Sequence, residues 1–186
     1  MTGFPARTDK DKVHTRNVMI GTYACTRDSI TVEGEFIEKR LKGYRSIVSG
    51  KRYPPQTIHH MIVRMLVMGD AFTITKIEGE MPVVPHAEEC RETLESLKMI
   101  KGLTISPGFT SRVKKLIGGT RGCVHLTTLL LAMAPAAVQG FWASRANEES
   151  VENLPDDLMQ KYLIDTCRVW RKNGSAAKKL KDSTAK

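Results

Sequence analysis

A cysteine and a histidine two residues apart follow a glycine-rich turn in the stretch GGTRGCVHL, residues 118–126. Apolar residues after them recur at helical spacing, so Cys123 and His125 are predicted at the start of a helix. Unpaired N–H groups and the helix dipole there favour the thiolate, the form that attacks electrophiles and binds metals. We therefore expect Cys123 to be a metal ligand or a nucleophile, and His125 to be a catalytic base or a further ligand. A buried structural cysteine and a hydrogen-bonded core histidine are the alternatives.

Two further sites along the chain carry side chains that bind metals. His59 and His60 begin a predicted strand, and Cys90 follows the turn PVVPH near a predicted helix start. Because neighbouring strand residues point to opposite faces, at most one of the two histidines reaches a given site. Thiolate and imidazole together suit zinc or iron. These residues therefore extend the candidate ligand set.

Three polar residues are candidates for substrate binding and proton transfer. His14 and Arg16 lie where the N-terminal arm enters the first predicted strand, and an arginine there can bind a carboxylate or a phosphate. Glu78, near the end of another predicted strand, can serve as a general acid or base. Solvated surface residues of these types are equally common. We expect His14 and Arg16 to bind a small anionic substrate and Glu78 to have a catalytic role.

An α+β fold is predicted to position these residues, with strands first and helices after. β-Branched and aromatic runs separated by turns predict strands at 18–25, 30–37, 58–68 and 71–78. Apolar residues at helical spacing predict helices at 87–100, 108–117, 123–141 and about 155–171. Pro135 is expected to interrupt the third of these helices. This order favours an antiparallel meander in the N-terminal half, with the helices packed on one face.

Length and charge suggest one domain with a basic end. The 186 residues suit a single domain over 13–172, between a flexible arm (1–12) and a basic disordered tail (173–186). From Arg171 to Lys186, six Lys/Arg and one Asp carry +5 of the net charge of +9. The remaining body is only weakly basic and contains no known recognition motif. We expect no specific binding to nucleic acid.

The cysteines and the apolar runs bear on the compartment. Four cysteines lie far apart without a C-x-x-C pair, which argues against a disulfide framework, a zinc ribbon and a thioredoxin-type dithiol. No apolar run approaches the roughly 20 residues that cross a bilayer. The basic start lacks the apolar segment of a secretory signal. A cytoplasmic protein without membrane contact is predicted.

Several motifs together resemble a bacterial family known as a domain of unknown function. The resemblance covers about residues 13–172 and is carried by VHTRN, RDSITVEGEF, IHHM, Cys90, GLTISPGF, GGTRGCVHL and YLIDTCRVWR. Members of this family carry H-T-R, a V-H-D-M-like strand start and G-G-x-x-G-C-x-H-L. This chain departs from the pattern at His60, where aspartate is usual, and in the turn before Cys90. The family itself implies no activity.

The order of strands, cysteines and helices is also similar to that of iron–sulfur scaffold proteins of the IscU/NifU type. Carried over by position, this resemblance implies His59 or His60, Cys90 and Cys123 as metal ligands. A histidine in the first position departs from the scaffold pattern, and a mixed His/Cys set suits zinc or iron better than a shared cluster.

Three functions remain open from the sequence. The first is a zinc or iron site with His59, Cys90 and Cys123 as ligands, in a small metal-dependent enzyme acting on an anionic substrate. The second is a cofactor-free enzyme with Cys123 as nucleophile. The third is a carrier or adaptor for a metal, an iron–sulfur cluster or a protein partner, with the basic tail as the contact. Self-association is left open in each case.

Overall fold

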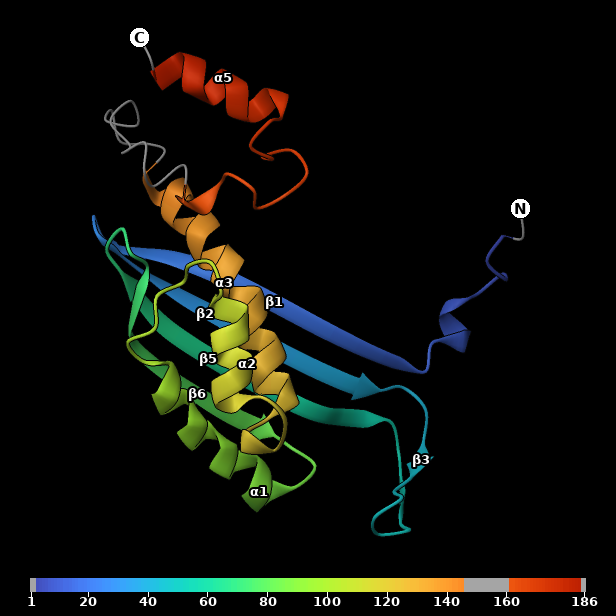
Figure 1. The fold of residues 1–186 in the computed structure, drawn as a ribbon. Coiled ribbons are helices and arrows are strands. Elements are labelled where there is room, and N and C mark those ends of the chain that lie inside the picture. Colours follow the sequence, from blue (N-terminus) through green and yellow to red (C-terminus); the bar gives the residue numbers. More distant parts are fainter. Residues whose placement is uncertain (1–2, 146–160, 185–186) are drawn as a thin grey trace.

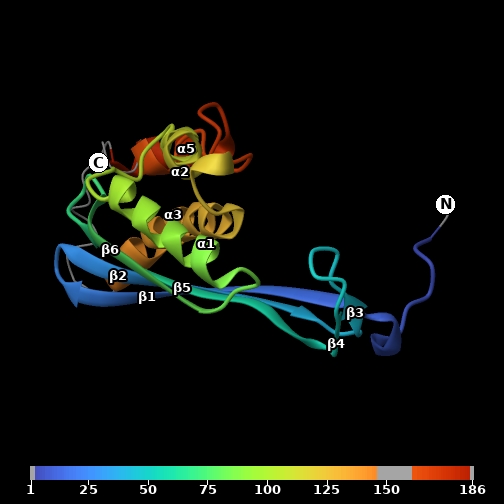
Figure 2. The ribbon, with the colours of Figure 1, turned by 90° about the horizontal axis from the view of Figure 1, so that it is seen from below.

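A four-stranded antiparallel sheet is the frame of this computed structural model, which describes residues 3–145 and 161–184. The strands are β1 (His14–Thr26), β2 (Ser29–Arg40), β5 (Gln56–Met68) and β6 (Thr73–Val83), in the order β1-β2-β5-β6. A separate short hairpin, β3 (Tyr44–Arg45) and β4 (Arg52–Tyr53), connects β2 to β5. It lies beyond the end of the sheet that the helices cover (Figures 1 and 2). The predicted meander is confirmed.

Alternation along β2 separates the two faces of the sheet. Ile30, Val32 and Phe36 are buried, whereas Glu33 and Glu35 between them are half-buried. This period of two is the strand repeat, and the buried set faces the helices. Each face of the sheet therefore has its own set of side chains.

Helices cover one face of the sheet, as Figure 2 shows. In chain order they are α1 (Ala87–Glu92), a 3-10 helix (Thr93–Ile100), α2 (Phe109–Ile117), α3 (Val124–Arg145) and α5 (Ser175–Thr184). A 3-10 turn (Asp9–Asp11) precedes the sheet, and another (Gly119–Arg121) precedes α3. Apolar residues at helical spacing along α3 are all buried: Leu126, Leu129, Leu130, Met133 and Ala137. The predicted α+β class, with helices on one sheet face, is confirmed.

Two predicted helices differ from the observed ones in the middle of the chain. Pro135 does not end α3, which continues from Val124 to Arg145. The lost hydrogen bond and ring clash of an internal proline are offset here by burial on both sides of it. In the segment 87–100 the α-helix ends at Glu92 and a 3-10 helix follows. There the hydroxyls of Thr93 and Ser96 bond to backbone carbonyl oxygens, which competes with regular helix geometry.

The C-terminal segment differs more. Of the helix predicted at about 155–171, residues 155–160 lie outside the described part, and 163–170 form turns and bends rather than a helix. The tail predicted to be disordered contains α5, in which Ala177 is fully buried. Alanine, lysine and leucine favour helices, which accounts for a helix within this basic segment.

Helix α3 is the one described helix that is long and apolar enough to cross a membrane by length and composition. Half of its apolar window is buried inside the fold, where it packs against the sheet. The core helix of a soluble protein passes the same test, so this helix is weak evidence for a membrane span. The predicted cytoplasmic location stays a prediction.

Candidate metal centre

A buried glutamate marks the site. Glu38, near the end of β2, is 4% exposed and continues the inward series of Val32 and Phe36. It was not among the residues predicted from the sequence. Burying a carboxylate is costly unless it is paired. A charged residue at an inward strand position is therefore the one sequence signal by which Glu38 could have been found. Its partners define the site.

Three partners reach Glu38 across the sheet. In the strand register, Arg16 of β1 lies opposite Glu38, which in turn lies opposite His59 of β5. Arg16 donates from Nε and Nη2 to Glu38 Oε1 over 2.9 and 2.6 Å. His14 Nε2 lies 2.9 Å from the same oxygen, and His59 Nδ1 lies 2.7 Å from Oε2. Strand pairing therefore collects one carboxylate, one guanidinium and two imidazoles at one point.

A third imidazole approaches from the helical layer. His125, in the first turn of α3, places Nε2 3.6 Å from Glu38 Oε2, and its ring centroid lies 4.0 Å from that of His59. The candidate ligand atoms of Glu38, His59 and His125 all lie within 4.8 Å of one another. We call these three residues the His–Glu cluster. It is a set of two histidines and one carboxylate, drawn from two strands and a helix.

The glycine-rich turn sets the helix start against the sheet. A Cβ at Gly122 would lie 2.6 Å from the Ile117 carbonyl oxygen, and one at Gly118 would lie 2.4 Å from that of Lys114. Side chains at these positions would clash with backbone, so the glycines allow α2 to end and α3 to begin in close contact. Cys123 directly precedes α3, as predicted, and its Sγ lies 3.7 Å from Nδ1 of His125.

The charges of the cluster shift two pKa values. Burial alone would raise the pKa of Glu38, but hydrogen bonds from Arg16 and His59, the charge of Arg16 and the contact with His14 lower it to about 2. Burial lowers the pKa of His125, the electrostatic influence of His59 and Arg16 acts in the same direction, and the attraction of Glu38 opposes it. At neutral pH the site thus combines an ionised carboxylate with a neutral imidazole, the forms that bind metals.

Four of the residues predicted for a site lie together. His14, Arg16 and His59 contact Glu38 directly, and His125 completes the cluster. Of the two adjacent histidines, His59 faces the site. His60 points to the opposite face, where Nε2 lies 2.8 Å from Glu35 Oε1.

The other predicted residues lie elsewhere. Cys90, on α1, is partly buried against the core and does not belong to the His–Glu cluster of the described residues. Cys123 contacts His125 but is also outside the cluster. Glu78 lies on β6 opposite Arg64, forms an ion pair with Lys76, and has a side chain that is 51% exposed. Cys90 and Cys123 as metal ligands therefore stay a prediction, and the described residues whose ligand atoms lie close together are Glu38, His59 and His125.

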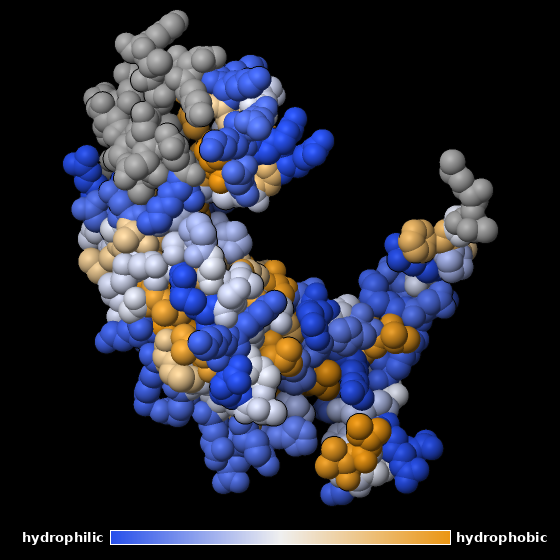
Figure 3. All heavy atoms as spheres, in the orientation of Figure 1, coloured by the Kyte–Doolittle hydropathy of each residue, from blue (hydrophilic) through white to orange (hydrophobic). Residues whose placement is uncertain are grey.

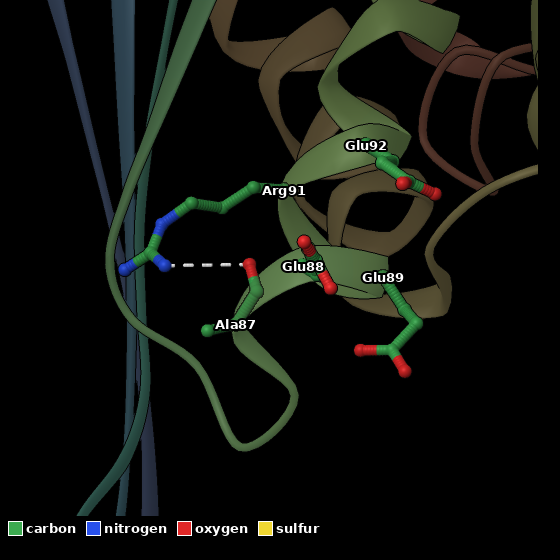
Figure 4. A pocket seen from close by; sticks show the side chains of 5 residues that line it. All are labelled: Ala87, Glu88, Glu89, Arg91 and Glu92. Atoms are coloured by element: carbon green, nitrogen blue, oxygen red, sulfur yellow. Dashed lines mark hydrogen bonds between the residues drawn. The ribbon is translucent and has the colours of Figure 1, made fainter.

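A separate group of glutamates on α1 does not form a comparable cluster. It lines a shallow hollow beside α1, made by Ala87, Glu88, Glu89, Arg91 and Glu92. Figure 4 shows the three carboxylates pointing in different directions, while Arg91 bonds to the carbonyl oxygen of Ala87 in its own helix. The carboxylates do not converge on a common point.

A family model covers the domain that holds the His–Glu cluster. Residues 14–139 match the model described as "Protein of unknown function (DUF2889)". The chain belongs to DUF2889. The domain-of-unknown-function family predicted from the sequence is thereby confirmed, and the matched range includes every residue of the cluster. No curated protein and no solved structure matches this DUF2889 chain, so these comparisons lend the IscU/NifU-type resemblance no support.

Proposed function

We propose that this DUF2889 protein binds a zinc or ferrous ion between Glu38, His59 and His125, and that the ion serves as a Lewis acid in an enzyme acting on a small anionic substrate. One observation carries the proposal: the candidate ligand atoms of these residues, from β2, β5 and α3, lie within 4.8 Å of one another. Such convergence of a buried carboxylate with two imidazoles matches the donor set of known zinc and iron(II) enzymes.

The spacing supports a single ion. Zinc binds histidine nitrogen and carboxylate oxygen at about 2.0–2.2 Å, so ligand atoms around one ion lie roughly 3–4 Å apart. Glu38 Oε2 lies 2.7 Å from His59 Nδ1 and 3.6 Å from His125 Nε2. The 2.7 Å contact is shorter than this spacing, so an ion would replace the hydrogen bond between Glu38 and His59 and the two atoms would lie farther apart.

The residues around the proposed ion favour a catalytic role over storage of the metal. Three protein ligands leave coordination positions open for water or substrate, and a bound ion makes water a nucleophile near neutral pH. His14 and Arg16 hold the second oxygen of Glu38, which orients the carboxylate. The Arg16 side chain is 47% exposed, so part of its guanidinium is accessible to a substrate carboxylate or phosphate.

Elemental analysis of anaerobically purified protein tests the proposal. We expect close to one zinc or iron per chain, and we expect His59→Ala to weaken the affinity for added metal by more than about 100-fold, because a direct ligand is lost. His60→Ala is the matched control, since His60 is the adjacent histidine on the other face. Absence of metal in the isolated protein together with no binding of added zinc or iron(II), or equal loss in both variants, would refute the site.

A second candidate function rests on Cys123. Its Sγ lies 3.7 Å from His125 Nδ1, while Nε2 of the same ring lies 3.6 Å from Glu38. This is the arrangement of a nucleophilic thiol with a base and an orienting carboxylate. The lowered pKa of His125 disfavours the imidazolium of a thiolate–imidazolium pair, which is why we rank the metal site first.

Alkylation by low concentrations of iodoacetamide at neutral pH separates the candidates. A nucleophilic Cys123 is expected to react faster than Cys25 and Cys167, although both of these are more exposed. His125→Ala should then slow Cys123 to the rate of the other two, because the base is gone. Rates that simply follow exposure in the wild-type protein would exclude Cys123 as the nucleophile.

A further inference from the structure

A cavity of about 520 Å³ lies between the β3–β4 hairpin and the nearby end of the main sheet. Its wall includes His59, so it borders the His–Glu cluster. The volume is within the usual range of small-molecule sites, about 300–1,000 Å³. A small ligand in the cavity therefore lies next to one residue of the cluster, His59.

The lining combines cations with an apolar and aromatic wall. Arg40 and Arg45 belong to it, and no aspartate or glutamate is among the described residues that line it. Tyr44 and Tyr53 stack with ring centroids 5.4 Å apart, and the Arg40 guanidinium lies 4.0 Å from the Tyr44 ring centroid. The apolar part consists of Ile47, Val48, Ile58, Val83, Val84 and Pro85.

The arginines have capacity for an acidic ligand. Within the described part of the chain, no carboxylate lies within ion-pair distance of Arg40, whose recorded contact is with the face of Tyr44. Arg45 donates from Nε to the Gly50 carbonyl oxygen over 2.7 Å, which uses one of its five donors. Stacking on Tyr44 restricts the Arg40 guanidinium, and a restricted guanidinium pairs with carboxylate or phosphate at lower entropic cost.

The exposed hydrophobic side chains of the hairpin lie next to this charge. Ile47 and Val48, at the tip, are 102% and 76% exposed, and Figure 3 shows an orange group on the hairpin beside hydrophilic surface. An apolar wall next to arginines that form no ion pair with the described residues suits a ligand with an apolar body and an anionic group.

We propose that the cavity binds a small aromatic acid, with its carboxylate or phosphate on Arg40, its ring against the tyrosine and valine wall, and its other end near His59. Identifying this ligand as the substrate rests on the proposed metal site, whereas its binding does not. Aromatic rings fit the flat stacked wall, and an anion complements a lining without carboxylates.

Calorimetric titration of the full chain after removal of metal by a chelator tests the cavity on its own. The probes are benzoate and phenyl phosphate, with benzamide as the neutral analogue and inorganic phosphate as the anion without a ring. We expect at least one of the two aryl anions to bind about tenfold or more tightly than either control, and Arg40→Gln to remove that advantage. Arg52→Gln, on β4 but outside the lining, should leave affinity unchanged.

The outcomes separate the two proposals. Failure of both aryl anions to bind, equal binding of benzamide, or equal losses in the Arg40 and Arg52 variants would overturn the cavity proposal. Selective aryl-anion binding by a protein that takes up no zinc or iron would uphold it and refute only the metal site. Tyr44→Ala gives a second check: the aryl anion should lose more affinity than inorganic phosphate, because phosphate loses only the restraint on Arg40 whereas the aryl anion also loses the stacked wall.

Discussion

Replacing Glu38 by glutamine is expected to lower the free energy of unfolding by about 3 kcal/mol at neutral pH and to abolish binding of zinc or iron. The pKa of Glu38 falls from 4.5 to about 2 because Arg16 and the histidines outweigh the cost of burial. The size of this pKa shift sets the expected loss of unfolding free energy. The glutamine side chain has the shape of the glutamate side chain but lacks its charge. Its amide nitrogen is a hydrogen-bond donor, and it would face donors of the Arg16 guanidinium or of the histidines.

The pH dependence of this difference has a definite sign. A carboxyl group with a folded pKa of about 2 and an ordinary pKa of 4.5 releases its proton more readily in the folded state. Its stabilising contribution is complete above the unfolded pKa and declines as the pH falls toward the folded one. Urea denaturation of metal-free protein should therefore show the gap between wild type and Glu38→Gln narrowing as the pH falls below about 4.5.

Glu35→Gln is the matched control. Glu35 lies on the same strand but on the opposite face, its side chain is 30% exposed, and it pairs with His60. A partly exposed pair is worth about 1 kcal/mol or less, and its loss should leave metal affinity unchanged. A Glu38 variant no less stable than this control would show that the buried network contributes little to the fold.

Local periodicity accounts for what was predictable in the fold. The inward positions of α3 and the alternation of β2 follow from repeats of 3.6 and 2 residues, which need no knowledge of distant contacts. Pro135 shows the limit of such rules. Its cost is local and certain, but the burial that offsets it depends on packing between α3 and the sheet, which the segment alone does not reveal.

The site was predictable only in part, for a different reason. His14, Arg16, His59 and His125 stand out by residue type, whereas glutamates are common on strands and Glu38 matters only because the register aligns it with Arg16 and His59. Cys90 was chosen from the order of elements, which does not fix distance. Its helix follows β6, an edge strand that β5 separates from β2. Register and strand order are long-range properties, so they escape single-segment patterns.

Replacing Gly122 by alanine is expected to lower the free energy of unfolding by about 2 kcal/mol and to weaken metal affinity by about tenfold or more. Its Cβ would lie 2.6 Å from the Ile117 carbonyl oxygen and 3.2 Å from Ser96 Oγ. The backbone at Ile117 cannot move aside as a flexible side chain does, so the turn between α2 and α3 must open. That displacement is passed to His125, three residues later in the first turn of α3.

Gly119→Ala in the same turn separates general strain from displacement of the ligand. Gly119 has a φ of 63°, and no atom lies within 4 Å of the position that an added methyl group would take. Alanine there therefore costs about 1 kcal/mol without moving the helix start. Chemical denaturation and metal titration of both variants give the comparison. If Gly119→Ala weakened metal binding as much as Gly122→Ala, general strain in the turn would by itself explain the loss of metal affinity. If only Gly122→Ala does so, the close contact between α2 and α3 is what holds the third ligand in reach of the sheet.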